Sequence, residues 1–162
     1  LRYFNPIGAH SSGLIGENPC GSPNNIFPII TQVALRNKKY LKVYGNDWDT
    51  HDGTGVRDYI HVVDLAKGHI SAINFIEQSS GSQIFNLGTG QSFSVLEVIK
   101  SFEKMSGVSI KYEFAPKREG DLDKYFTNAQ KSRDILMWKT NLNLDQMTND
   151  AWNWQLKNPD GY

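Results

Sequence analysis

Three arginines stand where a guanidinium group could hold a phosphate: Arg2 in an apolar segment, Arg57 at the start of an extended run, and Arg118 in a charged turn. The planar guanidinium donates paired hydrogen bonds to a phosphoryl group, and each charge-assisted bond contributes about 1.5–3 kcal/mol. A single exposed arginine more commonly forms a surface ion pair, which contributes little. The residues alone therefore indicate candidate anion sites and leave the ion-pair alternative open.

The histidines and glycines give weaker signals. The four histidines have no paired spacing on one helix and no cysteine cluster beside them, so the sequence predicts no metal site. Gly88-Thr89-Gly90 lacks the further glycine, or the Lys-Ser/Thr pair, of a phosphate-binding loop. His69 falls on the apolar side of an expected helix, which favours a packed core histidine over a catalytic one.

The elements that must position these residues alternate between strand and helix. Hydrophobic spacing predicts strands over residues 1–4, 41–44, 56–62, 84–87 and 108–114. It predicts helices over residues 26–36, 64–76, 94–107, 129–137 and 143–158. This alternation favours an α/β fold. Residues 8–25 are rich in glycine and proline, and they form a loop long enough to suggest a binding role.

Local signals mark the helix ends and the buried faces. We expect N-caps at Asn25 and Asp64, and capping boxes at Ser94 and Asn143. The helix after Asp64 is expected to bury one stripe of side chains: Leu65, Ala66, His69, Ile70, Ile73 and Ile76. The last strand should place three side chains on one face: Ile110, Tyr112 and Phe114.

Composition limits the classes of partner. The chain has 17 Lys plus Arg against 17 Asp plus Glu, and this balance argues against nucleic acid or an anionic membrane as a partner. Hydrophobic residues make up 39% and charged residues 21%, which is typical of a globular domain. With one cysteine, Cys20, and no long apolar run, we expect a cytoplasmic protein without a membrane span. The apolar start at Leu1 without methionine indicates a fragment.

Several segments occur in an order that carries a family resemblance. They are Arg2-Tyr3-Phe4-Asn5-Pro6-Ile7-Gly8-Ala9-His10, Pro23-Asn24-Asn25, Tyr44-Gly45-Asn46-Asp47, Asp52-Gly53-Thr54-Gly55-Val56-Arg57-Asp58-Tyr59-Ile60-His61-Val62, Asn86-Leu87-Gly88-Thr89-Gly90, Arg118-Glu119-Gly120-Asp121 and Trp152-x-Trp154-Gln155. Over the whole chain they resemble the carboxyl-terminal half of the UDP-galactose 4-epimerase (UDP-glucose 4-epimerase) family of the extended short-chain dehydrogenase/reductase superfamily. The run over residues 52–62 separates this group from the related sugar-nucleotide dehydratases and decarboxylases.

The resemblance implies an isomerase that interconverts UDP-glucose and UDP-galactose. In the family, bound NAD takes a hydride from sugar C4, the 4-keto sugar turns over, and the hydride returns to the opposite face. The tyrosine base, its Tyr-x-x-x-Lys lysine, a serine and the glycine fingerprint for the cofactor pyrophosphate belong to the amino-terminal half. This chain contains neither motif, so we expect it to hold no catalytic residue, to be inactive alone, and to leave NAD mainly to the other half.

The resemblance also assigns residues to a site. Its substrate-binding positions are Asn5, Asn25, Ile26, Lys42, Tyr44, Arg57, Arg118, Asp121 and Tyr125. Two further positions, Tyr3 and Phe4, would meet the nicotinamide, although an aromatic pair in a strand is equally explained by packing.

Each assigned position has an implied role. Asn5, Arg57 and Arg118 would contact the diphosphate, and Asp121 the ribose hydroxyls. Asn25 and Ile26 would line the same groove, and Lys42 and Tyr44 would present backbone and ring to uracil. Tyr125 would lie beside the sugar.

The fold implied by the resemblance is part of a Rossmann-like doubly wound sheet plus a smaller α/β substrate-binding lobe. We expect residues 1–8 and 56–90 to pack on the nucleotide-binding sheet and residues 9–55 and 91–162 to form the substrate lobe. The resemblance further implies a homodimer in galactose metabolism. A second hypothesis is a non-catalytic nucleotide-sugar-binding fragment or a degenerate partner subunit.

Overall fold

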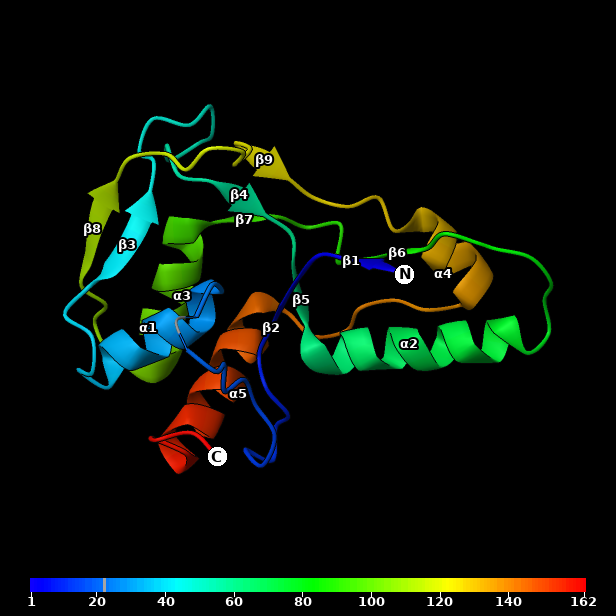
Figure 1. The fold of residues 1–162 in the computed structure, drawn as a ribbon, viewed down its shortest axis with the longest axis horizontal. Helices are drawn as coiled ribbons and strands as arrows, with labels where there is room; N and C mark the ends of the chain where they lie inside the picture. The colour runs from blue at the N-terminus through cyan, green and yellow to red at the C-terminus, as the bar shows by residue number, and fades with distance from the viewer. Residues whose placement is uncertain (22) are drawn as a thin grey trace.

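The computed structural model describes residues 1–21 and 23–162. Two groups of elements lie side by side in it (Figure 1). The first group comprises α1 (Ile26–Ala34), β3 (Leu41–Tyr44), α3 (Val95–Ser106), β8 (Tyr112–Ala115) and α5 (Leu144–Lys157). The second comprises β1 (Arg2–Tyr3), α2 (Val62–Ile76), β6 (Asn86–Leu87) and α4 (Gln130–Leu136). Strands and helices therefore alternate as the hydrophobic pattern predicts, and the α/β class is confirmed.

Short strand pairs, mostly parallel, connect the elements. β1 pairs with β6, and β3 pairs with β8, in parallel. Between the two groups, β2 (Asn5–Ile7) pairs in parallel with β5 (Tyr59–His61). β4 (Val56–Arg57) lies between an antiparallel neighbour, β7 (Phe93–Ser94), and a parallel one, β9 (Lys124–Tyr125). The expected strand over residues 56–62 is thus divided into β4 and β5, and Val62 already belongs to α2.

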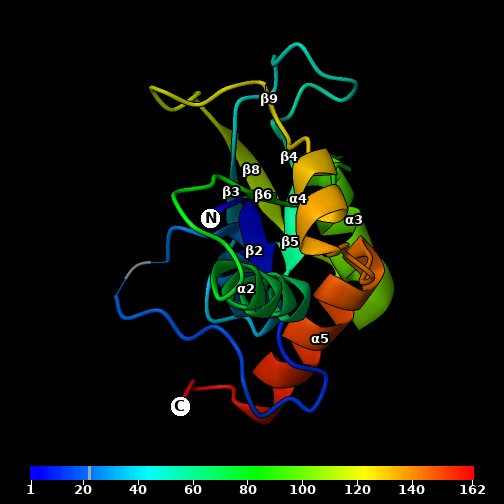
Figure 2. The same ribbon diagram turned by 90° about the vertical axis from the view of Figure 1, so that its right-hand side faces the viewer.

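The buried apolar residues form two clusters. The larger packs α1, α3, α5 and β3 together around Ile30, Phe102 and Met147. The smaller joins α2, α4, β5 and β6 through Ile60, Leu87, Leu136 and Trp138. Figure 2 looks almost along α2 and shows α4 lying over it. Residues 136 and 138 therefore pack with the segment over residues 56–90, whereas the expected lobe division placed them with the rest of residues 91–162.

The start of α2 differs from the prediction. The N-cap is His61, whose Nδ1 accepts a hydrogen bond from the Val63 N–H at 3.0 Å. Asp64 lies inside the helix, and its Oδ2 accepts hydrogen bonds from the backbone N–H groups of Asn141 (2.8 Å) and Leu142 (2.9 Å). The expected cap at Asp64 is therefore wrong, because the carboxylate binds a segment distant in sequence instead of the first turn of its own helix.

The buried face of α2 is also different from the expected one. Ile70, Ile73 and Ile76 are 59%, 56% and 68% exposed, and His69 is exposed as well. The buried positions are Asp64, Gly68 and Ala72, which follow each other at a spacing of four. A Cβ at Gly68 would stand 2.9 Å from Leu87 and 3.1 Å from Trp138, so the helix lies too close to its neighbours for a larger side chain. Small residues face the core here, and the predicted stripe was wrong for that reason.

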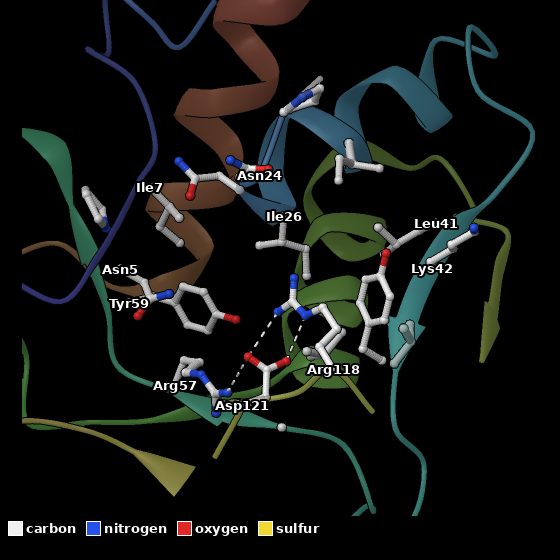
Figure 3. Close-up of a pocket in the computed structure, with 18 of the residues that line it drawn as sticks. Asn5, Ile7, Asn24, Ile26, Leu41, Lys42, Arg57, Tyr59, Arg118 and Asp121 are labelled. Atoms are coloured by element: carbon white, nitrogen blue, oxygen red, sulfur yellow. Dashed lines mark hydrogen bonds and ion pairs between the residues drawn. The ribbon is translucent and has the colours of Figure 1, made fainter. Parts of the chain in front are cut away.

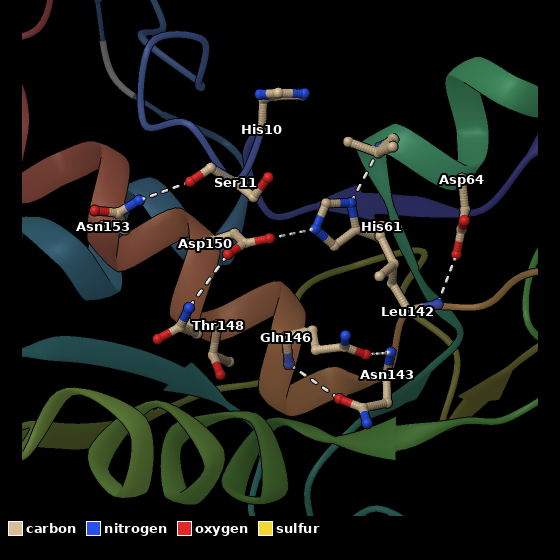
Figure 4. A network of polar contacts seen from close by, with 12 residues as sticks. His10, Ser11, His61, Asp64, Leu142, Asn143, Gln146, Thr148, Asp150 and Asn153 are labelled. Atoms are coloured by element: carbon tan, nitrogen blue, oxygen red, sulfur yellow. Dashed lines mark hydrogen bonds and ion pairs between the residues drawn. The ribbon is translucent and has the colours of Figure 1, made fainter.

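A polar network joins α2 and β5 to α5 (Figure 4). The fully buried His61 lies with its Nε2 3.3 Å from Asp150 Oδ2 in α5, while its Nδ1 accepts from α2. Burial lowers the pKa of His61 below its ordinary value, although the neighbouring Asp150 acts in the opposite direction. The neutral ring therefore donates to Asp150 and accepts at the helix start, which fixes α5 against the strand that leads toward Arg57.

Most helix ends agree with the sequence signals. Helix α1 follows Asn25, and both capping boxes are present, from Ser94 to Glu97 and from Asn143 to Gln146. Strand β8 begins only at Tyr112, and Ile110 is buried while Tyr112 and Phe114 are 40% and 48% exposed. Only Tyr112 and Phe114 of the predicted common face thus lie on the strand and in solvent, where the two rings contact each other edge to face.

Met137 offers a stability test. It follows α4 with φ +52° in the left-handed region, and its side chain is 85% exposed. A residue with a Cβ pays roughly 1–2 kcal/mol for that conformation, whereas glycine does not. We expect Met137→Gly to raise the free energy of unfolding by about 1 kcal/mol in urea titrations. Met137→Ala keeps the Cβ and serves as the control; equal stability of the two variants would contradict this explanation.

Candidate functional site

A pocket of about 230 Å³ opens between β3, the start of α1, β4 and the turn that follows β8 (Figure 3). Its wall includes eight of the nine positions that the family resemblance assigned to the substrate: Asn5, Asn25, Ile26, Lys42, Tyr44, Arg57, Arg118 and Asp121. These residues come from five separate segments of the chain. The fold thus brings together residues that the sequence could relate only through a resemblance.

The Arg57 side chain lines the pocket and is held by hydrogen bonds to backbone carbonyl groups. Its Nη1 donates to the carbonyl oxygens of Val56 (2.9 Å) and Asp123 (3.4 Å), one on β4 and one just before β9. Its Nη2 lies 3.9 Å from Asp121 Oδ1, and the side chain is 18% exposed. The guanidinium is therefore fixed on one edge and keeps donors on its other edge for a ligand.

Arg118 approaches the same carboxylate from the opposite side (Figure 3). Its Nε donates to Asp121 Oδ2 at 2.8 Å and its Nη2 to Oδ1 at 3.3 Å. The guanidinium carbon also lies 4.6 Å from the centre of the Tyr44 ring, a cation–π contact. Two guanidinium groups thus converge on one carboxylate, an arrangement that concentrates positive charge at the pocket.

Strand β3 supplies a backbone edge. Leu41 N donates to Lys111 O and Gly45 N to Ala115 O, each at 2.8 Å, so the odd-numbered residues direct their backbone groups toward β8. Successive residues in a strand direct these groups to opposite edges. The N–H and C=O of Lys42 therefore lie together at the pocket edge, while Tyr44 O accepts from Trp48 Nε1 at 2.9 Å.

The amino end of α1 also opens on the pocket. The N-cap Asn25 makes no side-chain hydrogen bond to the helix, and the first turn contains no acidic residue. The Asn25 amide nitrogen instead donates to Glu17 Oε1 at 2.7 Å. The first backbone N–H groups of this helix, with the partial positive charge of the helix dipole, therefore add to the positive side of the pocket.

Two aromatic residues of the wall were not singled out from the sequence. Tyr59 is 3% exposed, and burial raises the pKa of its hydroxyl to about 12, so it stays a neutral donor at physiological pH. Trp48 lies in the polar segment after β3. A large aromatic side chain among acidic and amide residues is the sequence signal that could have indicated Trp48. Tyr59 gives no such signal, since it looks like an ordinary strand residue.

Three of the assigned aromatic residues lie outside the pocket wall. Tyr125 is half-exposed on β9, and its ring stacks on Phe4 with centres 4.8 Å apart. Tyr3 is exposed on β1, with its ring 5.9 Å from that of His69. Arg2 is on the same short strand and also lies outside the pocket wall. The three assigned aromatic residues therefore form two separate ring contacts, Tyr3 with His69 and Phe4 with Tyr125.

The Gly88-Thr89-Gly90 loop binds a carboxylate of the chain itself. Asp58, which is fully buried, accepts from Thr89 N at 2.9 Å, Thr89 Oγ1 at 2.6 Å, Gly90 N at 2.9 Å and Thr127 N at 3.3 Å. The N–H groups that a phosphate loop would direct at a ligand are thus already bonded. Among the described residues, no group of three His, Cys, Asp or Glu side chains is placed to hold a metal ion. Within the same part of the chain, no helix is long and apolar enough to cross a membrane.

Comparison with known proteins shows the family of the chain. The profile described as GDP-mannose 4,6 dehydratase matches residues 1–151. The chain belongs to this family. Among its relatives, the UDP-glucose 4-epimerase of Yersinia pestis is 53% identical over 162 residues, which is all of this chain and 48% of that protein. The human UDP-glucose 4-epimerase is 52% identical over the same length and is covered to 47%.

A solved structure of a UDP-glucose 4-epimerase also has the fold of this chain. The UDP-glucose 4-epimerase of Bifidobacterium longum in complex with NAD+ and UDP superimposes with a TM-score of 0.96 and 52% identity, covering 99% of this chain and 48% of that one. The chain spans about half the length of the curated relatives it matches. The resemblance to the epimerases, stated from motifs, is confirmed by these matches.

Proposed function

We propose that this chain is the UDP-sugar-binding half of an NAD-dependent epimerase that interconverts UDP-glucose and UDP-galactose at C4. One observation carries the proposal: two arginines, a backbone edge and a helix amino end surround one pocket. The proposal draws its substrate from the relatives, since one epimerase structure of this fold holds NAD+ and UDP.

The β3 edge fits the uracil ring. Uracil presents an N–H donor between two carbonyl acceptors, and the adjacent N–H and C=O of Lys42 can pair with such a ring as a neighbouring strand would. The neighbouring Tyr44 ring offers a flat surface beside this edge, and Arg118 already lies against it. The contact at Lys42 uses backbone atoms, so it does not depend on the lysine side chain.

The paired arginines fit the diphosphate. Asp121 contacts both guanidinium groups but carries only one negative charge, whereas a diphosphate carries more negative charge and more acceptor oxygens. On binding, the phosphate oxygens would take over the donors of Arg57 and Arg118, and Asp121 would turn to the ribose hydroxyls. Asn5 and the first turn of α1 would supply neutral donors to the same group.

Binding can be tested without turnover. Isothermal titration of the chain should show saturable binding of UDP and at least tenfold weaker binding of ADP, whose base lacks the N–H between two carbonyls. Equal affinity for the two nucleotides would mean that the pocket recognises only the diphosphate. Absence of UDP binding would refute the proposed site.

The cofactor would be held mainly by residues outside this chain. NAD supplies the hydride acceptor and donor for C4 when bound. The Gly88–Gly90 loop offers no cradle for the cofactor phosphates, since Asp58 occupies the N–H groups of Thr89 and Gly90. Tyr3 and Phe4 would meet the nicotinamide, with the Phe4 ring already stacked on that of Tyr125. The exposed isoleucines of α2 would pack on the remaining part of a Rossmann-like sheet. The complete protein would be a cytoplasmic homodimer.

The alternative, a non-catalytic nucleotide-sugar-binding fragment, shares the pocket and differs in turnover. The 162 residues contain no Tyr-x-x-x-Lys motif and no Gly-x-Gly-x-x-Gly motif. We therefore expect no epimerisation of UDP-galactose by the chain alone with added NAD, because in the family these two motifs remove the C4 hydroxyl proton and hold the cofactor phosphates. Turnover above a protein-free control would contradict this expectation.

Tyr125 is proposed to limit the size of the sugar. Its ring is half-exposed beside Phe4, and an N-acetyl group at sugar C2 would need the same space. Such overpacking typically costs about 1–3 kcal/mol. In an epimerase completed with the missing half, Tyr125→Cys should raise kcat/KM for UDP-N-acetylgalactosamine relative to UDP-galactose, with the exposed Tyr112→Cys as control. An unchanged ratio would show that Tyr125 does not contact the sugar.

A further inference from the structure

One lysine joins two segments that border the pocket. Lys117 belongs to the turn after β8, and its Nζ lies 3.0 Å from Asp47 Oδ1, in the segment after β3. The same ammonium donates to the Asp47 carbonyl at 3.2 Å and lies 4.4 Å from the centre of the Trp48 ring. Lys117 therefore makes three contacts with the segment over residues 46–55 and none of them is to its own turn.

The packing around this contact is close. A Cβ at Gly45 would stand 2.1 Å from Trp48 Nε1 and 2.9 Å from Lys117 Cγ, so only glycine leaves room for both side chains. The Trp48 indole is itself fixed, because its Nε1 donates to Tyr44 O at 2.9 Å. Lys117 thus contacts a tryptophan that is itself hydrogen-bonded to the end of β3.

From this arrangement we propose that Lys117 is a positioning residue for Arg118. Lys117 and Arg118 are consecutive, so contacts that hold one residue limit where the backbone of the other can lie. Lys117 contacts Asp47 and Trp48, and Arg118 lines the pocket, where it contacts Tyr44 and Asp121. By holding residue 117 against the segment after β3, Lys117 would keep the Arg118 guanidinium in the pocket wall, where it can meet the diphosphate. The inference rests on the proposed UDP site.

The competing explanation is an ordinary surface ion pair, since the Lys117 side chain is 37% exposed. The two explanations differ in which ligand is affected. We expect Lys117→Met to lower the affinity for UDP three- to tenfold in isothermal titration and to leave uridine binding unchanged, because uridine has no diphosphate for Arg118 to hold. Lys117→Arg keeps a cation that reaches Asp47 and should restore UDP affinity. Lys104→Met, which removes an exposed lysine paired with Asp145, is the charge-matched control and should bind UDP normally.

A double variant makes the test specific. Once Arg118 is alanine, Lys117→Met should cause no further loss of UDP affinity, because the side chain that it positions is gone. If Lys117→Met fails to fold, Asp47→Ala removes the side-chain acceptor of Lys117 and makes the same comparison. Unchanged UDP affinity, or an equal loss for UDP and uridine, would overturn the inference while leaving the UDP site intact. If the unmodified chain binds no UDP, the proposed function is refuted and the inference is refuted with it.

Discussion

Arg57→Ala and Arg118→Ala are each expected to weaken UDP binding by about 1.5–3 kcal/mol, a loss of roughly tenfold to 150-fold. Both guanidinium groups converge on Asp121 in the pocket, and both would donate charge-assisted hydrogen bonds to the diphosphate. Isothermal titration with UDP measures the loss directly. Uridine should bind the two variants almost as it binds the parent.

The control for these variants is Arg133→Ala. Arg133 is exposed on α4, where its Nη2 donates to the Gln130 side chain at 2.9 Å, and it lies outside the pocket wall. The substitution removes the same charge without touching the site. If Arg57→Ala and Arg118→Ala bind UDP as Arg133→Ala does, the two arginines are ordinary ion pairs and the diphosphate assignment is wrong.

We expect Asp58→Ala to lower the free energy of unfolding more than any other substitution proposed for this chain. Four donors from two other segments converge on this buried carboxylate, three of them backbone N–H groups. Thr89 Oγ1 can donate to Gln91 O instead, which leaves three N–H groups without a partner. Each such buried donor costs about 1–3 kcal/mol, so we expect the free energy of unfolding to fall by at least about 3 kcal/mol. Urea titration followed by circular dichroism gives the value, and a chain that no longer folds is the upper limit of the same effect.

Two further variants show whether hydrogen bonding or packing is responsible. Asp58→Asn keeps the volume but directs an amide NH2 at N–H donors, so it should cost about 2–3 kcal/mol. Asp134→Ala removes an exposed carboxylate of α4 that accepts from Gln130, and it should change stability by less than about 0.5 kcal/mol. A loss below about 1 kcal/mol for Asp58→Ala would contradict the role assigned to this carboxylate.

The sequence predicted those features that depend on neighbours along the chain. The capping boxes at Ser94 and Asn143 need only residues three positions apart, and both are present. The alternation of strand and helix depends on the same short-range periodicity, and it correctly indicated an α/β fold. Eight of the nine substrate positions that the family resemblance assigned line one pocket, although their spacing along the chain says nothing about their proximity.

Features set by tertiary contacts escaped prediction. The isoleucines of α2 were expected in the core, but the close approach of Leu87 and Trp138 admits only the small residues Gly68 and Ala72. Asp64 looked like a helix cap because its partners, the N–H groups of residues 141 and 142, are more than seventy positions away. In the same way, the Gly88–Gly90 loop could not be distinguished from a weak phosphate loop until Asp58 was placed beneath it.

The most direct test of the proposed UDP site is a crystal structure of the chain with UDP. We expect uracil at the β3 edge, hydrogen-bonded to the backbone of Lys42, and the diphosphate within hydrogen-bond distance of both Arg57 and Arg118. Asp121 should have left at least one guanidinium group and should face the ribose. UDP bound elsewhere, or in this pocket with its phosphates turned away from both arginines, would contradict the account.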